Sequence, residues 1–123
     1  MGKYIISLVT ALFLFFNVSA QAEKTINRVV SQPELKGLLK MEDIQLIDVR
    51  TIEEYKGGHI GNAKNTDFYS SDFKSQLSKL VKNKPVLVYC HSGGRSGKTA
   101  LILKELGFKE VYDFQSGFSK WGN

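Results

Sequence analysis

Residues 85–107 read PVLVYCHSGGRSGKTALILKELG, and this stretch decides the fold. Its first part, residues 85–89, is short, apolar and rich in valine, which is typical of a buried strand. Residues 96–106 place apolar side chains at helical spacing, and Gly107 is suited to ending a helix. A buried strand that passes through a tight turn into a helix is the building unit of parallel sheets. The turn between them begins at Cys90, the only cysteine of the chain.

The rest of the chain continues this alternation of strands and helices. Ser31 with Glu34, and Thr51 with Glu54, form capping boxes that each predict the start of a helix. The other predicted elements are strands at Ile44–Val49, Asn62–Thr66 and Val111–Phe114, a helix at Ser71–Val81 and a short terminal helix at Gly117–Trp121. Short apolar strands between helices predict an α/β fold with a mainly parallel sheet covered on both faces. Sites in such folds lie at the carboxyl ends of the strands.

The first 22 residues have the layout of a secretory signal peptide. Lys3 precedes an apolar run, and Ala20-Gln21-Ala22 is a small-x-small cleavage pattern. A membrane span needs about 20 apolar residues, and this run is shorter, which favours cleavage after Ala20 or Ala22 over anchoring. We therefore expect one domain over residues 23–123, a periplasmic location and no stable membrane span after cleavage.

Composition and charge narrow the classes of function. One cysteine excludes an intrachain disulfide, and one cysteine with two histidines at unsuitable spacing argues against a structural zinc site. We expect no metal and no cofactor. The formal net charge of +5 permits anionic partners, but export argues against nucleic acid and favours the steering of small anions.

The turn after residue 89 has the composition of an anion cradle. Gly93 and Gly94 let the backbone curl, so that successive N–H groups can point at one anion. The following helix adds its positive end, and Arg95 adds a full positive charge. Such settings lower a cysteine pKa from about 8.5 to roughly 3.5–7.5. Cys90 is therefore predicted to be a reactive thiolate, against the alternative of a buried and inert thiol.

Neighbouring polar residues are assigned supporting roles. Ser92 and Ser96 offer hydroxyl groups to the loop or to the helix cap. Asp48 lies at the end of an apolar strand, where an unpaired carboxylate is costly, and we expect it to act as a brace by pairing with Arg50 or with a group near the loop. His91 either tunes the neighbouring thiol and contacts substrate, or faces solvent.

These segments together resemble the single-domain rhodanese family of sulfurtransferases, including its small periplasmic members. The matching segments are residues 47–50, 53–55, 58–63, 86–90 with the loop to 95–96, 106–108 with Val111, and Gly117 with Trp121. The resemblance implies a three-layer domain with a mainly parallel five-stranded sheet. It also implies that Cys90 accepts sulfur from a donor such as thiosulfate and passes it to cyanide or a thiol.

The resemblance assigns further roles around this persulfide chemistry. It implies that the loop amides hold the persulfide and that Arg95 holds the anionic end of the donor. The substrate-binding residues are expected to be His91, Ser92, Gly93, Gly94, Arg95 and Ser96. The expected partners are a small anionic sulfur donor and the acceptor, and a monomer suffices for this chemistry.

Three other functions compete with this interpretation. A cysteine-dependent phosphatase or arsenate reductase needs five residues between cysteine and arginine, whereas four separate Cys90 from Arg95. A nucleotide-binding P-loop is suggested by residues 93–99, but their glycine spacing is one residue short. A sulfur-carrier or binding module without turnover is the third alternative.

Overall fold

The computed structural model describes residues 24–122 and contains a five-stranded sheet in which every pairing is parallel. The strands lie in the order β1-β5-β4-β2-β3. Their bounds are β1 Ile26–Val29, β2 Gln45–Asp48, β3 Lys64–Asn65, β4 Val86–Tyr89 and β5 Glu110–Asp113. The expected α/β class with a mainly parallel five-stranded sheet is confirmed.

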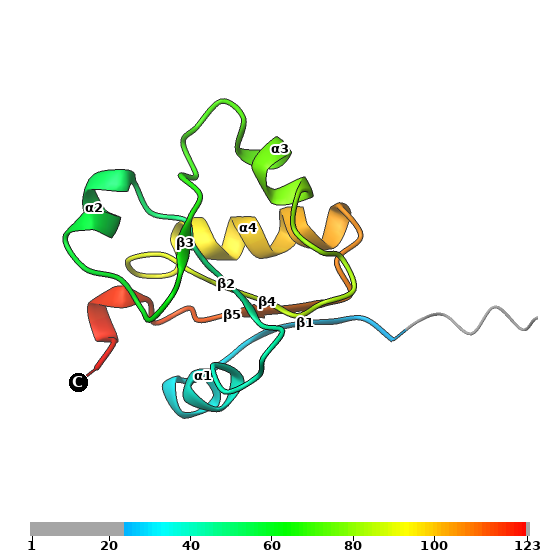
Figure 1. The fold of residues 1–123 in the computed structure, drawn as a ribbon, viewed down its shortest axis with the longest axis horizontal. Coiled ribbons are helices and arrows are strands. Elements are labelled where there is room, and N and C mark those ends of the chain that lie inside the picture. Colours follow the sequence, from blue (N-terminus) through cyan, green and yellow to red (C-terminus); the bar gives the residue numbers. More distant parts are fainter. Residues whose placement is uncertain (1–23, 123) are drawn as a thin grey trace, which may run out of the picture.

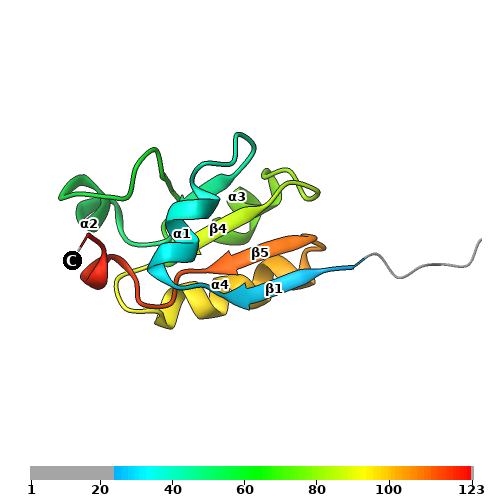
Figure 2. The ribbon, with the colours of Figure 1, turned by 90° about the horizontal axis from the view of Figure 1, so that it is seen from below.

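Helices cover both faces of this sheet. They are α1 Gln32–Leu38, α2 Ile52–Lys56, α3 Phe73–Ser78, α4 Gly94–Glu105 and the 3₁₀ helix η2 Phe118–Lys120. Helices α3 and α4 lie on one face and α1 on the other (Figures 1 and 2). Both views also place α2, η2 and the loop after β4 together at one end of the molecule (Figures 1 and 2). That end is the one at which the parallel strands terminate.

The central position of β4 explains why its sequence carries the strongest strand signal. All four of its residues are buried, because β2 and β5 flank it and helices cover both of its faces. Val86 and Val88 pack in the cluster with α3 and α4, whereas Leu87 and Tyr89 pack in the cluster with α1. A strand buried on both faces is a continuous apolar run rather than an alternating one.

The two capping boxes define helix starts as predicted. The Ser31 and Thr51 hydroxyl groups accept hydrogen bonds from the backbone N–H groups of Glu34 and Glu54. In each box the glutamate side chain accepts a hydrogen bond from the backbone of the capping residue. The second capping box fixes the position of Glu54, which pairs with Arg95 in the candidate active site.

Several element boundaries differ from the predicted ones. Helix α4 begins at Gly94 and not at Ser96, because Gly93 takes a left-handed N-cap conformation and starts the helix earlier. Helix α3 is shorter than the predicted 71–81, and the terminal helix is a single 3₁₀ turn. Strand β1 was not predicted, since its exposed edge position leaves little apolar signal.

The signal peptide predicted at residues 1–22 lies outside the described residues, and export therefore stays a prediction. Among residues 24–122, no helix has the length and apolar character needed to cross a membrane. The same part of the chain contains no cluster of three or more His, Cys, Asp or Glu side chains arranged to hold a metal ion.

Candidate active site

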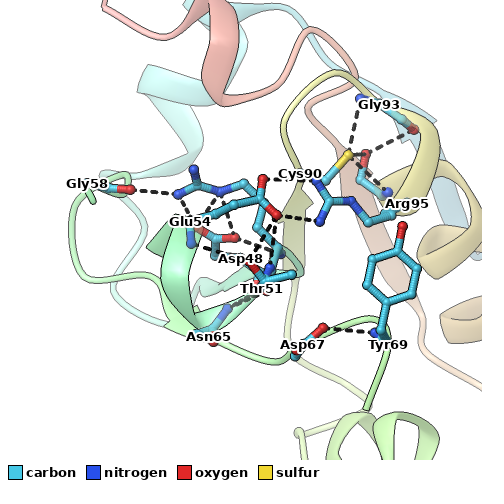
Figure 3. Close-up of polar contacts among 12 residues, drawn as sticks. Asp48, Thr51, Glu54, Gly58, Asn65, Asp67, Tyr69, Cys90, Gly93 and Arg95 are labelled. Carbon is cyan, nitrogen blue, oxygen red and sulfur yellow. Dashed lines mark hydrogen bonds and ion pairs between the residues drawn. The ribbon is translucent and has the colours of Figure 1, made fainter. Parts of the chain in front are cut away.

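The thiol of Cys90 lies in a cradle of hydrogen-bond donors. The backbone N–H groups of Gly93 and Ser96 donate to Cys90 Sγ at 3.1 and 3.4 Å, and Ser96 Oγ lies 3.6 Å from the same sulfur (Figure 3). Cys90 is 1% exposed. Its sulfur is therefore buried against polar groups and not against hydrocarbon alone.

The cradle determines the ionisation of the thiol. Burial raises the pKa of Cys90, because a buried charge loses its hydration. Hydrogen bonds from the Ser96 N–H and hydroxyl, and from the N–H groups of Gly93 and Ser92, outweigh burial and bring the pKa below its ordinary value. These bonds favour the thiolate, which is the nucleophilic form of cysteine.

The loop keeps its curl because it packs against the C-terminal segment. The N–H of Phe118 donates to Cys90 O at 2.8 Å, and the N–H of Ser119 donates to His91 O at 3.1 Å. A Cβ atom on Gly117 would lie 2.3 Å from His91 O, so only glycine allows this approach. The Gly117 segment therefore fixes the backbone on which the amide cradle is built.

We expect Gly93→Ala to lower the free energy of unfolding by about 1–3 kcal/mol. Gly93 has a φ of 104°, and a Cβ atom there would lie 2.6 Å from Gln115 O. Urea unfolding measures the change. Gly94→Ala is the matched control for stability, because Gly94 has open space around its Cα. Equal stability of both variants would show that the strained turn is not required.

Arg95 is paired with a carboxylate on α2. Its Nη1 and Nη2 donate to Glu54 Oε1 and Oε2 at 2.8 and 3.1 Å, and its guanidinium lies 5.8 Å from the Tyr69 ring centroid (Figure 3). The hydrogen bonds from Arg95 lower the pKa of Glu54 to about 2. Glu54 therefore stays ionised near neutral pH. Its negative charge compensates the positive charge of Arg95, which was predicted to bind the anionic donor.

The buried ion pair beside the site joins Asp48 and Arg50, one of the two pairings expected. Arg50 Nη2 donates to Asp48 Oδ2 at 2.7 Å and to Gly58 O at 2.6 Å (Figure 3). The guanidinium also lies over the Phe118 ring at 4.1 Å from its centroid. This brace links the end of β2 to the turn after α2 and to the C-terminal segment.

The predicted site residues fall into two groups. The backbone N–H groups of Gly93 and Ser96 point at the sulfur of Cys90. The side chains of His91 and Ser92, in contrast, are exposed. Gly94 is exposed at the first turn of α4, and Asp48 and Arg50 contact each other and not the thiol. Two neighbours of Arg95, Glu54 and Tyr69, were not predicted from the sequence. The capping box placed Glu54 on a helix but gave no sign of its second partner.

An amide-lined thiol at the turn between a parallel strand and a helix is an arrangement suited to a nucleophilic cysteine. Residues 31–123 match the Rhodanese-like domain family, and the chain belongs to that family.

Relatives in this family include sulfurtransferases. The chain is 40% identical over 92 residues to the thiosulfate sulfurtransferase GlpE of Coxiella burnetii, covering 75% of this chain and 84% of that protein. The structure of the human single-domain sulfurtransferase TSTD1 superposes with a TM-score of 0.68 at 25% identity, covering 76% of this chain and 93% of that one. The domain also matches a third of a larger protein of different activity: the tRNA uridine(34) hydroxylase of Cytophaga hutchinsonii is 31% identical over 102 residues, which are 80% of this chain and 33% of the hydroxylase.

Proposed function

We propose that this protein is a sulfurtransferase that moves a sulfane sulfur from thiosulfate to cyanide or a thiol through a persulfide on Cys90. The observation that carries the proposal is the pair of backbone N–H groups, from Gly93 and Ser96, directed at Cys90 Sγ. The family membership and the sulfurtransferase relatives support the same chemistry.

The reaction has two steps. The Cys90 thiolate attacks the outer sulfur of thiosulfate, the S–S bond of the donor breaks, and sulfite leaves with the bonding electron pair. The product is an anionic persulfide on Cys90, whose charge the loop N–H groups stabilise. Cyanide then attacks the outer sulfur, thiocyanate leaves, and the thiolate is restored.

The narrow cradle favours one extra sulfur atom over a larger group. Cys90 is 1% exposed, whereas the neighbouring His91 and Ser92 are exposed and form the outer side of the loop. A sulfur-carrier role uses the same persulfide but involves no turnover with a small acceptor.

The test is intact-protein mass before and after thiosulfate, followed by thiocyanate formation on adding cyanide. A gain of one sulfur atom followed by turnover to cyanide or a thiol supports the enzyme, and a gain of sulfur without turnover to either acceptor supports the carrier role. No gain of sulfur would refute both. Turnover of an aryl phosphate would support the phosphatase alternative.

We expect Glu54→Gln to lower the KM for thiosulfate by about two- to fivefold with a smaller change in kcat. The Glu54 carboxylate competes with an anionic donor for Arg95, and glutamine removes its charge while keeping an acceptor for the helix cap. Glu53→Gln is the matched control, because Glu53 is exposed on the same helix. Steady-state kinetics that give the same KM for both variants would argue against a role of the Arg95 charge in donor binding.

A further inference from the structure

Three segments that lead into strands lie together at the end of the molecule opposite the cradle. Both views place the turn before β4, the turn before β5 and the start of β1 at one end, away from α2, η2 and the loop after β4 (Figures 1 and 2). Backbone hydrogen bonds join them. The N–H of Lys109 donates to Lys82 O at 3.1 Å, and the N–H of Ile26 donates to Lys109 O at 2.8 Å. We call residues 24–25, 79–85 and 104–109 the basic end.

The basic end carries an excess of positive charge. Its charged residues are one glutamate, Glu105, and six lysines: Lys24, Lys79, Lys82, Lys84, Lys104 and Lys109. Further acidic residues lie at the neighbouring strand starts, Glu42 and Asp43 before β2 and Glu110 in β5. Lys82 and Lys84 are exposed, and neither has an ion-pair partner among residues 24–122. The two arginines near the cradle are, in contrast, both paired with carboxylates.

A glutamine side chain holds the turn before β4 in a fixed shape. Gln45 Nε2 donates to Val81 O at 2.9 Å and to Lys84 O at 3.3 Å. Gln45 Oε1 accepts a hydrogen bond from the N–H of Val81 at 2.8 Å. The residues of this turn, 81–84, are all exposed, and Val81 is 44% exposed. The turn therefore presents an apolar side chain next to two lysines on a preformed backbone.

This combination of side chains matches the surface of a lipid bilayer better than a soluble polyanion. Lysines are attracted to a surface that carries anionic headgroups. An apolar side chain beside them gains by entering the boundary between the headgroups and the acyl chains. A soluble polyanion would also attract Lys82 and Lys84, but it offers no apolar region to Val81.

We propose that the basic end binds the surface of an anionic lipid bilayer, with Lys82 and Lys84 at the phosphate groups and Val81 in the interface. The loop that carries Cys90 then faces away from the membrane, since it lies at the opposite end of the sheet (Figures 1 and 2). The apolar run before Lys24 is expected to bring the chain to a membrane, and Lys24 itself belongs to the basic end. This role is independent of the proposed sulfur transfer.

The test is cosedimentation of the full chain with vesicles of phosphatidylcholine, with and without phosphatidylglycerol. We expect binding that requires the anionic lipid and weakens as salt is added. Lys82→Glu with Lys84→Glu should weaken binding by about thirtyfold or more, because two attractive charges become repulsive. Lys98→Glu with Lys120→Glu is the matched control: it makes the same change of net charge at exposed positions in α4 and η2. Equal weakening by the two double variants would overturn the proposal.

Hydrogen–deuterium exchange locates the contact and serves also for a chain that keeps residues 1–22, whose apolar run would itself bind neutral vesicles. Intact-protein mass shows which form is present. Anionic vesicles should slow the exchange of amides in residues 79–84 and 106–109, and Lys82→Glu with Lys84→Glu should abolish that slowing. Slowing confined to the loop after β4, or none in either segment, would contradict the proposed orientation.

Val81→Ser separates a lipid surface from a soluble polyanion. Serine removes the apolar side chain, keeps the charge of the turn and leaves the backbone groups that bond to Gln45. We expect binding to anionic vesicles to weaken by about two- to fivefold. Unchanged vesicle binding would overturn the lipid surface in favour of a polyanion. Thermal unfolding checks the fold of each variant, and glutamine in place of both lysines serves if the glutamate variant fails to fold.

Discussion

The Cys90→Ser variant is expected to fold like the wild type, gain no sulfur from thiosulfate and lose thiocyanate formation by about a thousandfold or more. Serine keeps the shape of the side chain, but its hydroxyl group stays protonated at neutral pH, so the attacking anion is missing. The backbone N–H groups of Gly93 and Ser96 cannot replace that nucleophile, since they stabilise charge and form no bond to sulfur. Intact-protein mass and the cyanide assay measure both effects.

Two controls make this result specific. Wild-type protein alkylated with iodoacetamide should behave like the serine variant, because Cys90 is the only cysteine of the chain. Ser75→Ala, at an exposed position of α3 away from the loop, should keep full activity. A serine variant that still gains a sulfur atom would remove Cys90 from the mechanism.

The pH profile of sulfur loading follows from the same thiolate. The hydrogen bonds of the cradle lower the pKa of Cys90 despite its burial. The loading rate should therefore rise with pH through a midpoint below the ordinary value of about 8.5 and then level off. A midpoint above that value would mean that burial, and not the N–H groups, dominates in solution.

The elements predicted best are those whose sequence signal is local. The Thr51–Glu54 capping box and the apolar run of β4 depend on neighbours within a few residues, and both lie where predicted. Strand β1 was missed because an edge strand with exposed side chains carries little apolar pattern. The start of α4 was placed two residues late, because the left-handed conformation of Gly93 depends on its close approach to Gln115.

The residues of the site that are contiguous with Cys90 could be predicted from the sequence, but the pairs formed between distant residues could not. The glycines and serines after Cys90 are contiguous with it, so a cradle of N–H groups follows from the turn itself. Glu54 meets Arg95 across 41 positions of sequence, and the Tyr89 hydroxyl lies 2.9 Å from the backbone N of Ile60, 29 positions away. Such contacts depend on strand order, which the alternation of elements does not determine.

Arg50→Met is expected to lower the free energy of unfolding by about 3–5 kcal/mol, the largest stability loss among the variants considered. Arg50 and Asp48 are 3% and 0% exposed, so removing the guanidinium leaves a carboxylate with neither water nor its partner. The backbone N–H at position 50 still donates to Asp48 Oδ1, but the carbonyl group of Gly58 also loses its donor. Urea unfolding at neutral pH measures the loss.

The double variant Asp48→Leu with Arg50→Met shows whether the loss comes from an unpaired charge. Replacing both members of a buried ion pair by apolar residues is often nearly neutral, because the cost of burying the charges disappears with their attraction. The double variant should therefore be more stable than Arg50→Met alone. Equal or greater destabilisation would mean that the pair acts through its contacts with Gly58 and Phe118, which hold the turn after α2 and the segment beneath the loop. Folded molecules of either variant should still gain sulfur at Cys90, since neither Asp48 nor Arg50 bonds to the thiol.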